Sequence, residues 1–319
     1  MAQSQPLPPA IFLIGPTASG KTALAFELAT RFPCELISVD SAQVFRDMDV
    51  GTAKPDAETL QRFPHRLINL ISPEAHYSAA QFRHDALREM ASITASGRIP
   101  LLVGGTMLYV KALREGLADL PQADPTMRAQ IDADAATRGW AALHAELAVA
   151  DPETALRLKP TDAQRIQRAL EVVRLSGRTL GSYFAEQEAN APPYRWLTLA
   201  LVPDDRHILH RRIEQRFESM LTNGLVDEVV MLRAKYQLNA ELTSMRCVGY
   251  RQTWDMLEGV LPKAELRDRG VFATRQFAKR QLTWLRSLAR DMSDMRVFDP
   301  LAANTSSRIA QEVTEFISE

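Results

Sequence analysis

The stretch Gly15-Pro16-Thr17-Ala18-Ser19-Gly20-Lys21-Thr22 decides the fold of this chain. It matches the phosphate-loop pattern G-x-x-x-x-G-K-[ST], whose glycines let backbone N–H groups converge on phosphate oxygens at the start of a helix. The apolar run Ala10–Ile14 before it predicts a buried strand, and Thr22–Ala29 after it predicts a helix. Lys21 would add positive charge, and the Thr22 hydroxyl would be a ligand for Mg²⁺. The alternative is a glycine-rich turn that binds no ligand.

Strand and helix patterns alternate from residue 10 to about 120, which predicts an α/β fold with a P-loop NTPase-like parallel sheet. Glu35–Asp40 is expected to be a strand that ends on a carboxylate, and Ile99–Val103 one that runs into Gly-Gly-Thr106. Arg66–Ile71 and Trp196–Val202 are interpreted as further strands. Such sheets bind ligands at the carboxyl ends of their strands, where the phosphate loop, Asp40 and Thr106 would meet.

The composition changes after about residue 120. Residues 121–190 are rich in Ala, Glu and Arg and have helical spacing, which predicts a helical insertion domain. The insertion would divide a core made of residues 10–120 and 191–300, with a tail helix at 301–319. The core continues in helices, including a long one at Val271–Ala289 in which Phe277, Trp284, Leu285 and Leu288 are expected to face the core.

Composition excludes several classes of protein. The formal net charge of −1 argues against a globally basic nucleic-acid binder, yet residues 246–290 hold ten basic and four acidic side chains. That stretch is either a surface for a polyanion or a solvated helical face. The two cysteines, Cys34 and Cys247, form no disulfide or zinc pattern. With no apolar run long enough to cross a membrane and no signal peptide, we expect a cytoplasmic protein without membrane attachment.

Asp40 and Thr106 are the candidate reactive groups. Asp40 would either bind Mg²⁺ through water or act as a general base, unless it only caps the next helix. Thr106 would hydrogen-bond a reacting group or cap a tight turn. The strand before it lacks the terminal acid with which many ATPases hold Mg²⁺, so a motor-type ATPase is disfavoured. Arg212 and Arg216, one helical turn apart, are candidates to assist a phosphate.

Nine blocks together resemble the tRNA dimethylallyltransferase family, also called tRNA isopentenyltransferase. They span nearly the whole chain in order: Gly15–Thr22, Ile37–Val44, Met48–Pro55, Pro64–Leu67, Tyr77–Phe82, Leu101–Tyr109, Asp162–Val172, Arg246–Gln252 and Thr274–Arg286. Eukaryotic members carry a C-terminal zinc finger, whereas the tail after Asp291 has neither Cys nor His, so the chain is similar to the shorter bacterial form.

The resemblance implies transfer of a dimethylallyl group from dimethylallyl diphosphate to N6 of adenine 37, next to the anticodon, in tRNAs that read codons beginning with U. Asp40 would take the N6 proton, Lys21 and Mg²⁺ at Thr22 would stabilise the leaving diphosphate, Arg216 would assist, and Thr106 would position a reactant. The target base must be unstacked to reach such a pocket. The partner would be the tRNA anticodon stem-loop, and the enzyme is expected to be a monomer.

The resemblance also assigns two binding sets. The diphosphate would contact Gly15, Pro16, Thr17, Ala18, Ser19, Gly20, Lys21 and Thr22. The tRNA would contact Asp40, Ser41, Ala42, Gln43, Thr106, Arg128, Gln164, Arg165, Ile166, Gln167, Arg168, Arg246, Cys247, Val248, Gly249, Tyr250, Arg251, Lys279, Arg280, Gln281, Leu282, Thr283, Trp284, Leu285 and Arg286.

Three alternatives remain from the sequence. A P-loop small-molecule kinase would use Asp40 to activate a hydroxyl and Lys21 to bind ATP. An isopentenyltransferase could act on free adenine nucleotides, and a nucleotide-dependent RNA-binding protein would have no enzymatic activity. The insertion and the basic stretch favour tRNA, because neither a kinase nor a free-nucleotide enzyme needs them.

Overall fold

The computed structural model describes residues 7–186 and 191–319, and it divides into two units. The first, which we call the core unit, contains the described parts of residues 1–113 and 192–319. The second, the helical unit, contains those of residues 114–191. Within the described ranges, no helix is both long and apolar enough to cross a membrane.

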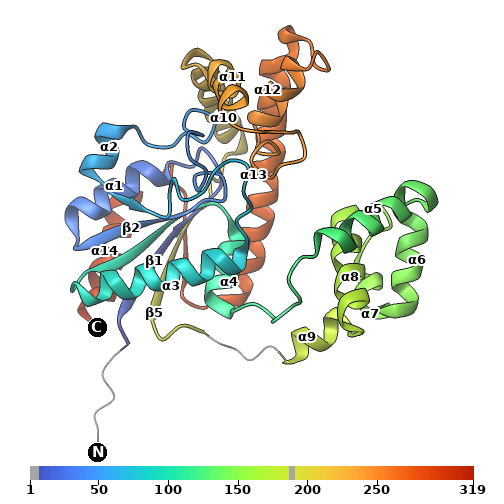
Figure 1. The fold of residues 1–319 in the computed structure, drawn as a ribbon. Helices are drawn as coiled ribbons and strands as arrows, with labels where there is room; N and C mark the ends of the chain where they lie inside the picture. The colour runs from blue at the N-terminus through green and yellow to red at the C-terminus, as the bar shows by residue number, and fades with distance from the viewer. Residues whose placement is uncertain (1–6, 187–190) are drawn as a thin grey trace, which may run out of the picture. The chain divides into compact units, whose positions relative to one another are not determined.

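A six-stranded parallel sheet forms the centre of the core unit (Figure 1). Its order is β3-β2-β4-β1-β5-β6, so the phosphate-loop strand β1 lies between β4 and β5. This arrangement confirms the predicted α/β fold. The strands are β1 (Pro9–Ile14), β2 (Cys34–Val39), β3 (His65–Arg66), β4 (Ile99–Gly104), β5 (Arg195–Leu201) and β6 (Met295–Phe298).

The third strand is much shorter than predicted. Only His65 and Arg66 pair with β2, whereas Arg66–Ile71 was expected to be extended. Leu67 and Asn69 have positive φ angles of 63° and 54°. Backbone in this left-handed region cannot continue a strand, so the chain turns away from the sheet directly after Arg66.

Alternate residues of β1 enter two hydrophobic cores, one on each face of the sheet. Ile11 and Leu13 pack with helices α1 and α14, whereas Phe12 and Ile14 pack with α3, α4, α10 and α13. This follows from the two-residue period of a strand. All five residues from Ala10 to Ile14 are fully buried, so the phosphate loop that follows them extends from a rigid strand.

Helices cover both faces of this sheet. The start of α3 is set by a capping box between Ser78 and Gln81. The helices outside the insertion are α1 (Lys21–Arg31), α2 (Ala57–Arg62), α3 (Ala79–Ala95), α4 (Met107–Glu115), α10 (Arg206–Thr222), α11 (Leu225–Lys235), α12 (Tyr250–Leu257), a 3₁₀ turn η1 (Lys263–Glu265), α13 (Leu266–Asp291) and α14 (Thr305–Ser318).

Helix α13 is longer than the predicted Val271–Ala289, and its aromatic residues differ from expectation. Leu285 and Leu288 are buried as predicted. Phe277 and Trp284 are 36% and 40% exposed, so the prediction that they face the core is wrong. They are seven residues apart and therefore share one face, about 100° away from the neighbouring positions Ala278 and Leu285 that do enter the core.

The helical unit has its own hydrophobic core, which includes Ile131, Leu143, Leu147, Ile166 and Leu170. Its helices are α5 (Pro125–Arg138), α6 (Trp140–Ala150), α7 (Pro152–Arg157), α8 (Ala163–Ser176) and α9 (Leu180–Glu186). The unit therefore has the packing of an independent small domain.

Candidate active site

A pocket of about 390 Å³ opens in the core unit where β1, β2 and β4 end. Helices α10 and α13, the 51–55 segment and the 243–248 segment supply further walls. Thirteen predicted site residues line it: Thr17, Lys21, Thr22, Asp40, Ser41, Ala42, Gln43, Arg216, Arg246, Cys247, Val248, Arg280 and Gln281. The predicted meeting of the phosphate loop and Asp40 at the carboxyl ends of the strands is therefore found in the structure.

The phosphate loop has the tight backbone that its sequence requires. A Cβ on Gly15 would lie 2.8 Å from the carbonyl oxygen of Leu201, so only glycine fits there. Gly20 and Ala18 have positive φ angles of 92° and 62°, which curl the chain into the start of α1. Lys21 Nζ donates to the carbonyl oxygen of Pro16 at 2.6 Å. The lysine thus folds over its own loop and lies at the pocket wall.

The pocket concentrates positive charge. Burial lowers the pKa of Lys21 to about 7, with a further lowering by the charge of Arg216 and an opposing effect of Asp40. Burial also lowers the pKa of Arg216, again against the effect of Asp40. Within residues 7–186 and 191–319, neither cation has a carboxylate within ion-pair distance. These two cations are therefore held where a bound anion would relieve their repulsion.

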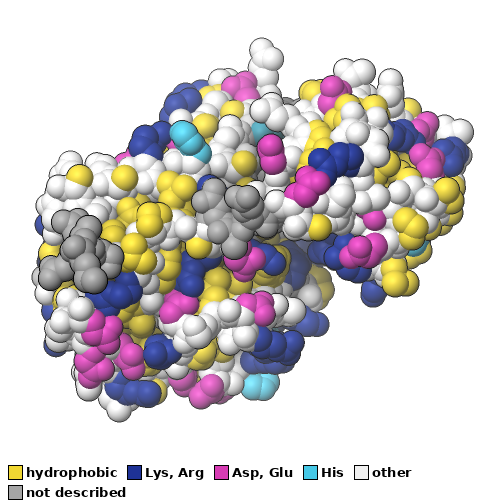
Figure 2. Space-filling view, turned by 90° about the horizontal axis from the view of Figure 1, so that it is seen from below, with side chains coloured by type: hydrophobic (Ala, Val, Ile, Leu, Met, Phe, Trp, Pro, Cys, Tyr) yellow, Lys and Arg dark blue, Asp and Glu magenta, His cyan; other side chains and the backbone are white. Residues whose placement is uncertain are grey.

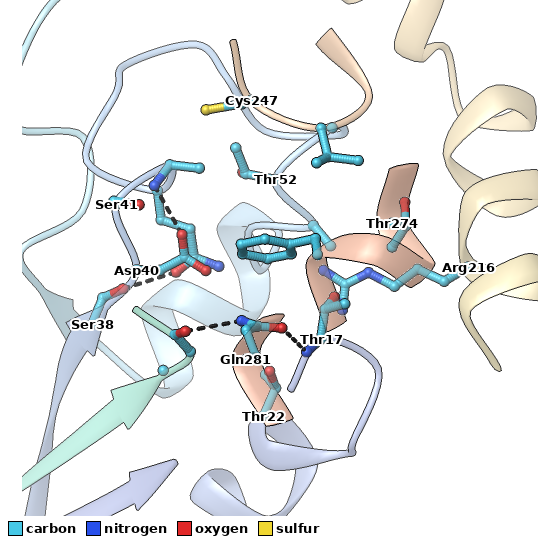
Figure 3. A pocket seen from close by; sticks show the side chains of 18 of the residues that line it. Thr17, Thr22, Ser38, Asp40, Ser41, Thr52, Arg216, Cys247, Thr274 and Gln281 are labelled. Atoms are coloured by element: carbon cyan, nitrogen blue, oxygen red, sulfur yellow. Dashed lines mark hydrogen bonds between the residues drawn. The ribbon is translucent and has the colours of Figure 1, made fainter. Parts of the chain in front are cut away.

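Thr106 holds the chain on both sides of Asp40. Its N–H donates to the carbonyl oxygen of Val39 at 3.1 Å, and its Oγ1 accepts from the N–H of Ser41 at 3.0 Å. Asp40 itself accepts from the N–H of Ala42 at 2.9 Å, in a turn and not at the start of a regular helix. The carboxylate faces the pocket across from Arg216 (Figure 3).

Several residues expected to contact tRNA have buried side chains, and this corrects the prediction. Ile166, Tyr250, Leu282 and Leu285 are at most 7% exposed and pack in hydrophobic cores. Gln281 is 5% exposed, with both amide atoms hydrogen-bonded inside the protein. Motif blocks on helices necessarily include core positions, because a helix turns every residue about 100° from the last.

Tyr250 shows what such a core position does. Its hydroxyl donates to Glu228 Oε1 at 2.5 Å, and the same carboxylate accepts from the N–H groups of Asp49, Val50 and Gly51. Burial and the negative charge of Glu228 raise the pKa of the Tyr250 phenol. This network fixes the 49–55 loop, which forms one wall of the pocket.

The exposed part of α13 carries cations. Lys279, Arg280 and Arg286 are exposed, and none of them has an ion pair within the described ranges. Thr283 and Trp284 are exposed on the same helix. On the face in Figure 2, Lys and Arg are interspersed with Asp and Glu. Arg246 and Arg251 differ from the α13 cations, because Glu241 and Asp255 pair with them at 2.5 Å and 3.2 Å.

In the helical unit, two of the predicted tRNA contacts hold a buried carboxylate. Arg128 and Arg168 bind Glu171, whose side chain is fully buried. Burial alone would raise the pKa of Glu171, but hydrogen bonds from both guanidinium groups and from the N–H of Asp124 lower it overall. Gln164 and Arg165 are exposed, and Gln167 donates to Asp132 at 2.6 Å.

Sequence reasoning missed much of the pocket wall. The 48–55 block was recognised as part of the family resemblance but not as a wall, and Phe277 was expected in the core. The sequence carried a clue only for the 48–55 block, because that block belongs to the family motifs; nothing in the sequence indicated that Phe277 would line the pocket. The lining residues that were not predicted are Ser38, Gly51, Thr52, Ala53, Pro55, His65, Val103, Gly104, Gly105, Ile213, Phe217, Met220, Thr243, Thr274 and Phe277.

Comparisons with known proteins agree on one family. The sequence profile of the IPP transferase family matches residues 43–288. A tRNA dimethylallyltransferase from Dechloromonas aromatica is 62% identical over 313 residues, which cover 98% of each chain. A protein of the same name from Nitrosomonas eutropha is 55% identical over 310 residues, covering 97% of this chain and 95% of the other.

Solved structures give the same result. A tRNA isopentenylpyrophosphate transferase from Bacillus halodurans aligns with a TM-score of 0.67 and 32% identity, covering 97% of this chain and 98% of that one. A eukaryotic dimethylallyltransferase described as acting on tRNA aligns with a TM-score of 0.83 and 25% identity, covering 98% of this chain and 80% of that one.

Proposed function

We propose, from the premise that this chain belongs to the IPP transferase family, that it transfers a dimethylallyl group from dimethylallyl diphosphate to N6 of adenine 37 in tRNAs that read codons beginning with U. The observation that carries the proposal is the pocket, in which Lys21 and Arg216, neither of which forms an ion pair with any described residue, face the Asp40 carboxylate. This arrangement suits a reaction that releases an anion at one end and a proton at the other.

The diphosphate would occupy the cation side. As the allylic C–O bond breaks, both bonding electrons leave with the diphosphate oxygen, and its added negative charge would be stabilised by Lys21, Arg216 and the loop N–H groups. Lys21 would exchange its contact with Pro16 for one with the phosphate. The interaction strengthens in the transition state, so it lowers the barrier and does not only tighten binding.

The adenine would occupy the carboxylate side. Its N6 lone pair is delocalised into the ring and is a weak nucleophile. Asp40 would accept a hydrogen bond from N6 and take its proton as the new C–N bond forms. In the structure Thr106 orients the backbone on both sides of Asp40, which keeps the carboxylate directed into the pocket.

A magnesium ion fits the oxygen atoms present. Thr22 lines the pocket and offers a hydroxyl, which is a ligand that Mg²⁺ accepts. Among the described residues no cluster of three or more His, Cys, Asp or Glu could hold a metal alone. The ion would therefore depend on diphosphate oxygens, and it would offset their charge when bound.

The tRNA would bind through cations and exposed planar side chains. Lys279, Arg280 and Arg286 form no ion pair with the described residues and would neutralise phosphates, and exposed Trp284 would stack on a base. Arg165 and Gln164 of the helical unit would add contacts to the anticodon stem-loop. We also propose that the enzyme acts in the cytoplasm as a monomer.

The decisive assay uses labelled dimethylallyl diphosphate with unmodified tRNA. We expect label in the tRNA and one diphosphate released per group transferred. Phosphorylation of a metabolite by ATP would instead establish the kinase alternative, and labelling of free AMP with none in tRNA would establish the free-nucleotide enzyme.

Asp40→Asn tests the base. Asparagine can still accept from Ala42 but cannot take a proton, so transfer should fall by about 10²–10⁴-fold. Affinity for tRNA, measured by fluorescence anisotropy, should change little. A large loss of tRNA affinity with unchanged turnover of bound substrate would refute the role as base.

A further inference from the structure

Gln281 connects two loops at the edge of the pocket from within α13. Its Oε1 accepts from the N–H of Thr17 in the phosphate loop at 2.8 Å, and its Nε2 donates to the carbonyl oxygen of Gly105 at 2.9 Å (Figure 3). The side chain is only 5% exposed. A buried amide with both ends paired holds its partners firmly, because breaking either bond leaves a buried polar group unsatisfied.

The fit around this amide is close. A Cβ on Gly105 would lie 2.4 Å from Gln281 Nε2 and 3.1 Å from the carbonyl oxygen of Gly15. The backbone at Gly105 therefore lies so close to the Gln281 side chain that there is no room for a Cβ, and position 105 requires glycine. Gln281 is inserted between the two loops and fills the space that any other residue at position 105 would need.

The link continues from Gly105 to the carboxylate. Thr106 follows Gly105 in the chain, and it bonds to Val39 and Ser41 on either side of Asp40. A connected path of short hydrogen bonds and peptide bonds thus runs from the phosphate loop, through Gln281, to the loop that carries Asp40.

We infer that Gln281 is a positioning residue that sets the spacing between the diphosphate-binding loop and the Asp40 carboxylate. This inference rests on the proposed function, in which the leaving diphosphate and the proton acceptor flank the reacting carbon and nitrogen. A displacement of about 1 Å in such an arrangement can cost about 10²-fold in rate. Gln281 touches neither substrate in this role; it acts through Thr17 and Gly105.

The test compares Gln281→Met, which keeps the volume but removes both hydrogen bonds, with wild type. We expect the single-turnover rate at saturating tRNA and dimethylallyl diphosphate to fall by about 10²-fold, with both dissociation constants within about threefold of wild type. Ser287→Ala, an exposed change on the same helix, should leave all three values unchanged. A saturated rate within threefold of wild type, or a loss that disappears at saturation, would overturn the inference.

A second variant covers failure of Gln281→Met to fold. Gln281→Glu keeps the acceptor for Thr17 but loses the donor to Gly105, so it should also slow the saturated rate, by about tenfold or more. An unchanged saturated rate in this variant would count against the positioning role.

Hydrogen exchange separates this inference from the proposed function, because it needs no substrate. In Gln281→Met the amides of Thr17 and Ser41 should both exchange faster than in wild type. If wild type transfers no prenyl group, the proposed function fails while this readout still tests the link. Unchanged exchange at Ser41 would show that the Asp40 loop does not depend on Gln281.

Discussion

The helical unit and the pocket of the core unit differ in how many of their cations have a carboxylate partner. Seven arginines of the helical unit each have a carboxylate partner: Arg128, Arg138, Arg157, Arg165, Arg168, Arg174 and Arg178. In the described core unit, Lys21 and Arg216 at the pocket and Lys279, Arg280 and Arg286 on α13 have no ion pair. A carboxylate partner offsets the charge of an arginine, whereas a cation without such a partner keeps its charge available for a bound polyanion.

The largest expected difference is in the rate of prenyl transfer, between a variant of Arg216 and a variant of Arg174. Arg216→Met should reduce prenyl transfer by about 10²–10³-fold, because it removes a cation from the developing diphosphate charge. It should not lower the melting temperature, since burial disfavours the charge of Arg216 in the free protein. Arg174→Met breaks contacts with Asp134 and Glu146 and should lower the melting temperature with little effect on transfer at saturating substrates. Equal effects of the two changes on transfer would contradict the proposal that unpaired Arg216, and not paired Arg174, acts on the diphosphate.

Glu171→Ala tests the paired side of the comparison. It removes a fully buried carboxylate from two arginines and leaves the N–H of Asp124 without its acceptor. Because the arginines are 43% and 30% exposed and can reach water, we expect a loss of about 2 kcal/mol in unfolding free energy. Denaturant unfolding followed by far-ultraviolet circular dichroism would measure it. Loss of less than a few tenths of a kcal/mol would show that the pair network is not structural.

The unpaired cations on α13 should control salt dependence. Replacing Lys279 and Arg286 together by alanine should weaken tRNA binding about tenfold and reduce the slope of log affinity against log salt by roughly one per cation. Arg138→Ala, which removes a cation paired with Glu146, is the matched control and should leave the slope unchanged. The same slope in all three proteins would place α13 away from the RNA.

The smallest effect concerns the proton on Lys21. With a pKa of about 7 in the free protein, Lys21 is half protonated near pH 7 and increasingly neutral above it. A bound diphosphate would restore the charge and raise this pKa, so binding takes up a proton, and affinity should fall about fivefold from pH 7 to pH 8. Calorimetry in buffers of different ionisation enthalpy would measure the uptake. Lys21→Arg, which is charged throughout, should show no uptake and no such decline.

The same low pKa affects stability in a defined direction. Between about pH 7 and the ordinary lysine pKa of 10.5, the unfolded chain binds a proton that the folded chain does not. The contribution of Lys21 to the unfolding free energy therefore increases as the pH rises through this window. In Lys21→Met this contribution should be absent, which separates it from other titrating groups.

Short sequence patterns were enough to predict the part of the fold around the phosphate loop. The phosphate loop, its strand and helix, and the carboxylate at the end of the next strand were all predicted, because a glycine pattern and apolar runs act over a few residues. The 66–71 strand was wrong because a short apolar run does not reveal positive φ angles at Leu67 and Asn69.

Helix α13 shows a feature that short sequence patterns did not predict correctly, namely which of its side chains are buried. Its helical periodicity was readable, but the predicted core face was drawn too wide: Leu285 is buried as expected, whereas Phe277 and Trp284, about 100° further round the helix, are exposed. Which face is buried depends on what packs against the helix, and that information lies elsewhere in the chain.

The sequence by itself determined the class of chemistry: a phosphate loop, an acid beside it and the motif blocks of a prenyltransferase family. Only the tertiary structure decided which of those residues meet. It paired Arg128 and Arg168 with a buried Glu171. Among the described residues it left Lys21 and Arg216 without a carboxylate within ion-pair distance, and it placed Gln281 between Thr17 of the phosphate loop and Gly105. The physical reason is that pairing, burial and spacing depend on contacts between residues far apart in sequence, which no local pattern encodes.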